Sequence, residues 1–150
     1  MDTEEWVKQQ EIRKALQQWL LQWRPQWFCT MNLPPKKNYN DAEGYLKEWR
    51  RPFHKAGIEI GYNGLYLSVP HPHIHLLAMG CDKDEPSLIY VDREKWEQEW
   101  ARLTKQTAVI RWINDPEAVT EYVAFKNTVP GKYELLSPHN EKMLGRYKRK

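Results

Sequence analysis

Cysteine and histidine are both scarce in this chain, which has 150 residues but only 2 Cys and 5 His. Cys29 and Cys81 lie far apart and neither belongs to a CxxC pair, which excludes a cysteine-rich zinc site and a disulfide framework. No apolar run is long enough to span a bilayer. The N-terminus is acidic and polar, unlike a secretory signal. We therefore expect a soluble, cytoplasmic protein that makes no use of a membrane.

The chain also has little excess of positive over negative charge. The net charge is +3, which permits a polyanionic partner without demanding one. No GxxxxGK loop is present, so the chain carries no nucleotide-binding loop of that kind. The abundant residues are aromatic, with 8 Trp and 8 Tyr. Most of these should pack in a core, and some could stack on nucleobases.

The length fits one domain, 1–150, which we divide into an N-terminal helix (1–25), a core (26–128) and a basic C-terminal tail (129–150). Apolar spacing and capping residues predict helices over 3–23, 41–56, 116–127 and a stretch that begins after Asp92. Strands are predicted over 26–33, 58–62, 65–69, 73–79 and 107–113, with a turn at Asn63–Gly64. Short turns between the central strands favour an α+β fold, a central antiparallel sheet covered by helices.

The segment HPHIHLL, 71–77, holds three of the five histidines. On a strand, His73 and His75 share a face, about 7 Å apart along the chain, and could bind one metal ion from the same side. An antiparallel return at Asn63–Gly64 would place Glu59 beside them as a third ligand. Two His and one carboxylate suit a divalent ion that keeps positions open for substrate oxygens. The alternative is an ordinary polar strand face.

Three segments resemble the motifs of the HUH endonuclease superfamily, and most closely those of rolling-circle plasmid replication initiator (Rep) proteins. WFCTMNLP, 27–34, resembles the first motif. Glu59 with His73 and His75 resembles the metal-binding second motif, and EYVAFK, 121–126, resembles the third. The resemblance covers residues 26–128 and implies an RRM-like palm, in which an antiparallel sheet carries the site.

The resemblance also implies a reaction. Tyr122 would attack a phosphodiester of single-stranded DNA at an origin or hairpin, forming a 5′-phosphotyrosine link and freeing a 3′-hydroxyl. A divalent ion, Mn or Mg, would polarise the phosphate, and Lys126 would offset charge or help to deprotonate Tyr122. The family spacing is TyrxxLys, whereas Lys126 here is the fourth residue after Tyr122, which still lies on the same face of an α-helix. Unwinding would require a separate helicase.

Contacts to DNA are expected from basic pairs and from one tyrosine. Lys36, Lys37, Arg50 and Arg51 could meet phosphates, and Tyr62 could stack on a base. Ordinary solvated charge is the alternative for each basic pair.

Three other functions remain open at this point. The chain could be a transposase of the HUH class, or a non-catalytic DNA-binding module on the same fold. It could also be a metal-dependent hydrolase without a DNA partner. For the two residues of the third motif, the alternatives are that Tyr122 is a core aromatic and that Lys126 is a solvated surface residue. Nothing in the sequence sets the oligomeric state.

Overall fold

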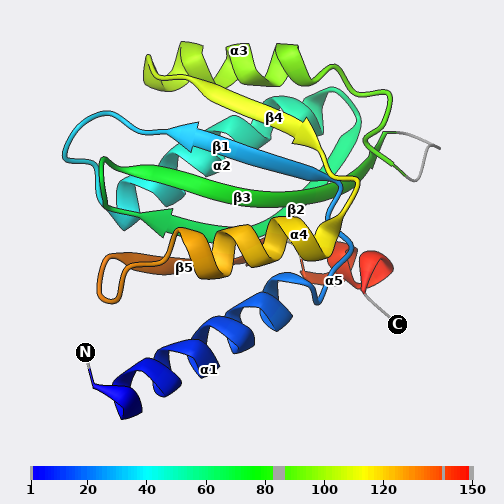
Figure 1. Cartoon of the computed structure of the whole chain (residues 1–150). Helices are drawn as coiled ribbons and strands as arrows, with labels where there is room; N and C mark the ends of the chain where they lie inside the picture. Colours follow the sequence, from blue (N-terminus) through cyan, green and yellow to red (C-terminus); the bar gives the residue numbers. More distant parts are fainter. Residues whose placement is uncertain (1, 83–86, 140, 149–150) are drawn as a thin grey trace.

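Five antiparallel strands form one sheet in the computed structural model, which describes residues 2–82, 87–139 and 141–148. The sheet order is β4-β1-β3-β2-β5, so that β3 lies at the centre and β4 at one edge (Figure 1). The predicted α+β fold, a central antiparallel sheet with helices packed against it, is confirmed. The strands are β1 (Trp27–Asn32), β2 (Ile58–Leu67), β3 (His73–Asp82), β4 (Ala108–Trp112) and β5 (Tyr133–His139).

Polar side chains begin the four main helices. Asp2, Asn38, Asp92 and Asp115 each accept a backbone N–H at an N-cap. No helix in the described part of the chain combines the length and apolar content needed to cross a bilayer. The helices are α1 (Thr3–Leu20), α2 (Tyr39–Lys55), α3 (Arg93–Thr104), α4 (Pro116–Glu121), which continues as the π-helix η1 (Tyr122–Lys126), α5 (Glu141–Leu144) and the 3₁₀ helix η2 (Gly145–Tyr147).

Alternating residues of β3 separate two apolar cores. Ile74, Leu76 and Ala78 face the layer formed by α2 and α3. Leu77 faces the opposite layer, where α1 and η1 pack. The connectivity β1-α2-β2-β3-α3-β4 is the ferredoxin-like arrangement, with α1, α4 and η1 added on the second face and β5 added at the β2 edge of the sheet. In Figure 1, α4 passes in front of the sheet near β2, and α1 lies below the sheet in this view.

The turn predicted at Asn63–Gly64 is wrong, because both residues lie inside the continuous strand β2. Gly64 pairs with Leu76 of β3, and the chain reverses only after Leu67. A Cβ atom built on Gly64 would lie 2.2 Å from the carbonyl oxygen of His75. The glycine therefore permits the close approach of the β3 backbone, a common reason for glycine inside a strand.

The segment predicted as a basic tail instead contributes a fifth strand. β5 pairs with β2, for example Leu135 with Leu65, and closes the edge of the sheet opposite β4. Beyond it, the guanidinium of Arg24 donates to the carbonyl of Arg146 at 2.7 Å. Within 141–148 the chain thus lies against the α1–β1 connection.

We predict opposite effects for two glycine-to-alanine substitutions. Gly64→Ala should lower the free energy of unfolding by about 1–3 kcal/mol, because the new methyl group overlaps the His75 backbone. Gly44→Ala should raise it by about 0.5–1 kcal/mol, because Gly44 lies in α2 with nothing within 4 Å of the added Cβ. Urea denaturation of both variants measures the two effects. Equal stabilities would contradict the β2–β3 register.

Candidate functional site

Side chains that lie opposite one another on neighbouring strands build the candidate site, on the face of the sheet that carries α1 and η1. Antiparallel pairing places Asn32 opposite His73 and Thr30 opposite His75. On the other side of β1, Val109 of β4 lies opposite Thr30. Directly opposed residues hold their Cβ atoms about 4.5–5.5 Å apart on one face. The first and second sequence motifs therefore form one continuous surface.

Tyr122 reaches the same surface from the end of α4. Its ring centroid lies 6.3 Å from that of His75 and 6.3 Å from that of Phe28. Phe28 also contacts the His75 ring edge-on, at 5.4 Å. Tyr122 is 49% exposed, although its neighbours His75 and Val123 are buried. The predicted catalytic tyrosine and the predicted histidine pair are thus brought together, with the tyrosine open to solvent.

Tyr122 and Lys126 begin and end a single π-helical turn. In a π-turn each backbone hydrogen bond joins residues five apart, so the turn encloses one more residue than an α-turn. The Asn127 side chain caps the turn by donating to the Tyr122 carbonyl at 2.9 Å, and the Thr128 hydroxyl donates to the Ala124 carbonyl at 2.7 Å. Lys126 is exposed on this turn. Such turns occur frequently at functional sites.

Burial favours the neutral form of both histidines of the pair. His75 is 4% exposed, and burial, followed by the charge of His73, lowers its pKa to about 4. Burial also lowers the pKa of His73, against a smaller opposing effect of its backbone hydrogen bond. His73 Nδ1 lies 2.8 Å from the His71 carbonyl oxygen, which can only accept, so Nδ1 carries the proton and Nε2 the lone pair. A neutral imidazole is the form that binds metal ions.

His71 extends the row of imidazoles beyond the pair. Its ring centroid is 5.2 Å from that of His73, which in turn is 5.0 Å from that of His75. His71 Nε2 lies 3.0 Å from Oδ1 of Asn32, whose Nδ2 donates to Thr107 at 2.7 Å. These hydrogen bonds connect the end of β1 both to the segment before β3 and to the segment before β4.

Glu59 is not the third ligand that the sequence analysis predicted. It pairs with Cys81, six residues along β3 from His75, which corresponds to about 20 Å. The prediction failed because β2 does not turn at Asn63–Gly64. The Glu59 carboxylate instead forms an ion pair with Arg146 at 3.2 Å. Within 2–82, 87–139 and 141–148, no group of three or more His, Cys, Asp or Glu is arranged to hold a metal ion.

Two of the predicted metal ligands nevertheless fit a divalent ion. His73 presents the Nε2 lone pair, and His75 has a buried Nδ1 without a hydrogen-bond partner. A buried polar atom of this kind is satisfied by a bound ion or a water molecule. A divalent ion bound here would take two nitrogen donors from the chain, and water or substrate oxygens would supply its other ligands.

Most of the predicted DNA contacts lie elsewhere. Tyr62 is only 6% exposed and packs in the core under α2, where burial raises its pKa to about 12. Its predicted stacking on a base is therefore wrong. Arg50 and Arg51 belong to α2, on the opposite side of the sheet, and Arg51 pairs with Glu48. The pair 36–37 follows β1, at the end of the sheet where His73 lies.

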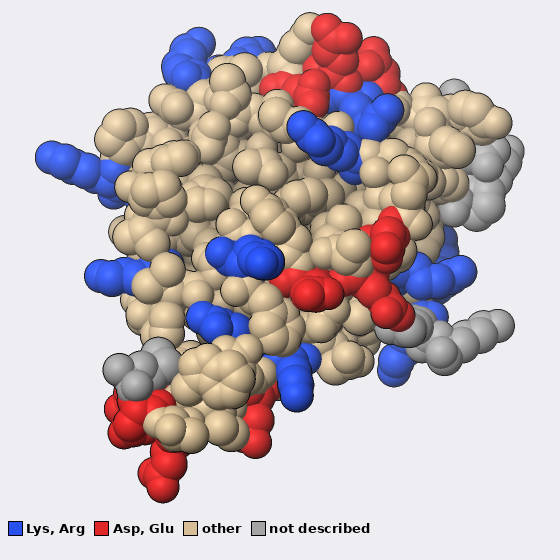
Figure 2. Space-filling view, viewed as in Figure 1, with Lys and Arg blue, Asp and Glu red and all other residues tan. Residues whose placement is uncertain are grey.

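A cavity of about 550 Å³ opens beside His75 and Tyr122, toward the edge strand β4. Sequence analysis missed three polar residues of its wall: Thr30, Arg111 and Asn114. Strand parity could have identified Thr30 and Arg111, since they alternate with buried residues of β1 and β4. In the space-filling view of this face, Lys and Arg side chains, together with groups of Asp and Glu at the top and on the right, border a largely uncharged surface (Figure 2).

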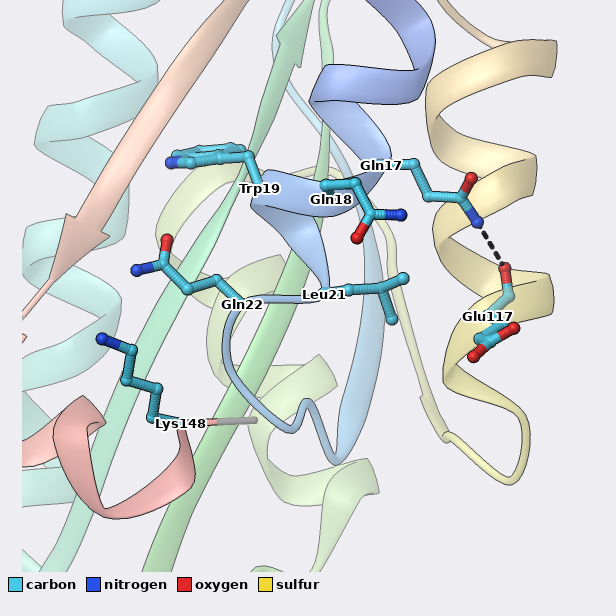
Figure 3. A pocket seen from close by; sticks show the side chains of 7 residues that line it. All are labelled: Gln17, Gln18, Trp19, Leu21, Gln22, Glu117 and Lys148. Carbon is cyan, nitrogen blue, oxygen red and sulfur yellow. Dashed lines mark hydrogen bonds between the residues drawn. The ribbon is translucent and has the colours of Figure 1, made fainter. Parts of the chain in front are cut away.

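A second cavity, of about 650 Å³, lies between the end of α1, the start of α4 and Lys148 (Figure 3). Three glutamines contribute to its walls, and one of them, Gln17, donates to the Glu117 carbonyl at 3.2 Å. Neither the histidine pair nor Tyr122 lines this cavity. The candidate chemistry therefore belongs to the smaller cavity.

Comparisons with protein families, curated proteins and solved structures find no match to this chain. The functional argument therefore depends on the arrangement of the residues themselves.

Because burial lowers the pKa of His75, acid should destabilise the metal-free protein. Between pH 6.5 and about 4 the unfolded chain binds a proton that the folded protein does not, so stability is complete above pH 6.5 and falls as the pH drops toward 4. The full loss amounts to about 3 kcal/mol. His75→Gln should reduce this pH dependence, measured by urea denaturation in EDTA, whereas His54→Gln, on α2, should not. An unchanged pH dependence in His75→Gln would contradict the assignment.

Proposed function

We propose that this protein nicks and rejoins single-stranded DNA through a covalent link to Tyr122, and thereby initiates rolling-circle replication. One observation carries the proposal. An exposed tyrosine on a π-turn lies 6.3 Å, between ring centroids, from a buried neutral histidine of an HxH strand. The two residues come from distant parts of the chain. A tyrosine required only for packing would be buried, whereas Tyr122 is 49% exposed.

The reaction is a transesterification. The Tyr122 oxygen forms a bond to phosphorus while the bond from phosphorus to the 3′ oxygen breaks. The leaving oxygen takes up a proton as a 3′-hydroxyl, and the tyrosine proton passes to solvent. Because a phosphodiester is exchanged for a phosphotyrosine ester, the released 3′-hydroxyl can attack in reverse and rejoin the strand.

Residues of the chain assist this step by orientation and charge. Phe28 contacts the Tyr122 ring edge-on and limits its movement. Lys126, on the same π-turn, supplies positive charge to the phosphate. A divalent ion, Mn or Mg, held by His73 and His75 would act as a Lewis acid on the phosphate oxygens. The surface over β1 and β4 would receive the bases, and a separate helicase would supply the single strand.

A non-catalytic DNA-binding module is the second candidate. It is favoured by one observation, the separation of Glu59 from the histidine pair, which leaves the predicted ligand set incomplete. A transposase of the same class would use the same site and chemistry as the initiator. The following experiment separates catalysis from binding alone.

Tyr122→Phe should abolish the covalent protein–DNA adduct. The protein is incubated with Mn²⁺ and a pool of random single-stranded oligonucleotides that includes hairpins, and adducts are resolved on a denaturing gel. Removing the hydroxyl removes the nucleophile, so the band should fall by at least about 10³-fold, the scale seen when catalytic nucleophiles are removed. Tyr90→Phe, at a residue that is 79% exposed and outside the site, is the matched control. No adduct with the unsubstituted protein would favour the binding module.

Metal affinity should depend on the histidine pair and not on Glu59. His75→Ala removes one of two nitrogen donors and should weaken Mn²⁺ binding by at least about tenfold, as measured by calorimetry. Glu59→Gln should leave the affinity unchanged, because Glu59 pairs with Cys81 at the other end of β3. If Glu59→Gln weakened binding as much as His75→Ala, the β2–β3 register at the site would be wrong.

A further inference from the structure

The cavity beside Tyr122 has walls of two different kinds. Phe28, Val109 and Val119 give it an apolar side, while Thr30, Arg111 and Asn114 give it polar groups. Its volume of about 550 Å³ lies within the range of pockets that enclose small organic ligands. A nucleobase has the matching chemistry, since its faces are apolar and its edges carry donors and acceptors.

Arg111 is positioned to face this cavity by strand pairing. It lies opposite Phe28 in the β1–β4 register, so both side chains belong to the face that carries His75. Arg111 is exposed, and none of the ion pairs in the described part of the chain includes it. Its guanidinium therefore retains its hydrogen-bonding capacity for a ligand.

Asn114 lies just beyond the end of β4, between that strand and the N-cap Asp115. It is exposed, and its side chain takes part in no hydrogen bond among the residues that the structure describes. An arginine and an asparagine together favour purines, because Arg pairs with O6 and N7 of guanine, and Asn pairs with N6 and N7 of adenine.

The location relates this pocket to the reacting phosphate. His75 and Tyr122 line the same cavity as Arg111 and Asn114. A base in the pocket would therefore belong to a nucleotide next to the phosphate that Tyr122 attacks. β4 is the edge strand of the sheet, so a single DNA strand can enter from the open side.

We propose that this cavity binds a purine base adjacent to the scissile phosphate, and that Arg111 and Asn114 determine the sequence preference of the nick. This inference rests on the proposed function, since it assigns substrate specificity to the same site. It identifies the substrate as single-stranded DNA with a purine at one fixed position beside the cleaved bond.

The test begins with the sequences that the protein selects. Random single-stranded oligonucleotides are incubated with the protein and Mn²⁺, and the DNA in the covalent adducts is sequenced. The expected result is a purine at one position flanking the nick. Replacing that purine by an abasic site should reduce the adduct yield by about tenfold or more. A pyrimidine preference, or no preference, at the flanking positions would overturn the proposal.

Variants then connect the preference to the two residues. Arg111→Ala and Asn114→Ala should each reduce discrimination at that position by about tenfold, measured as the ratio of adduct yields with the purine and abasic oligonucleotides. Arg93→Ala and Asn40→Ala, on the helices of the opposite face, should leave it unchanged. Arg111→Lys keeps the charge but loses the planar fork, so discrimination should not be restored. Full discrimination in the Arg111→Lys variant would show that Arg111 contacts a phosphate and would overturn the base assignment.

The two proposals fail in different ways. No adduct from any oligonucleotide would refute the nicking activity itself. An adduct whose flanking sequence is the same in the unsubstituted protein, Arg111→Ala and Asn114→Ala would refute only the purine pocket. Direct binding of oligonucleotides to the Tyr122→Phe protein, followed by fluorescence polarisation, measures the preference without the covalent step. There, the purine-containing oligonucleotide should bind about tenfold more tightly than its abasic counterpart.

Discussion

The pairing of β3 on both sides is the constraint on which the rest of the structure depends. β1 and β2 pair with its two edges. A shift of β3 by one residue would turn each of its side chains to the other face and would break the hydrogen bonds to both neighbours. This parity directs Ile74 and Leu76 into the aromatic core under α2 and α3. It directs His73 and His75 to the other face, where η1 brings Tyr122. The site is therefore a direct consequence of strand register.

The same burial that stabilises the sheet also lowers the pKa of both histidines. A solvated imidazole is partly protonated near neutral pH, and a proton on its ring nitrogen competes with a metal ion. Enclosed beside Phe28 and Tyr122, His75 has a pKa of about 4 and remains neutral. The tyrosine, in contrast, stays half-exposed. The site thus combines a buried, neutral histidine with a solvent-accessible tyrosine, on neighbouring elements.

The sequence predicted the local features well and the long-range register poorly. Period-two alternation correctly placed His73 and His75 on one face, and the Asp115–Pro116 start of the Tyr122 helix was also correct. Glu59 was misplaced because an Asn-Gly pair signals a turn in isolation, whereas here the close approach of β3 requires the glycine. β5 was missed because Pro138 and the charged residues nearby resemble a tail. Neither error could be detected from local propensity, since both depend on which strands pair.

The π-turn that carries Tyr122 has a consequence for how the length of this segment can vary. α1 holds the segment at two points, because Gln17 binds the Glu117 carbonyl and Arg13 binds the Thr128 carbonyl. Between these fixed points an α-helix accommodates a set number of residues, and a π-turn accommodates one more. An insertion between Tyr122 and Lys126 is thus absorbed within one turn, while Val123 and Ala124 stay packed in the core. The spacing between Tyr122 and Lys126 can therefore differ by one residue without displacing the helix that presents them.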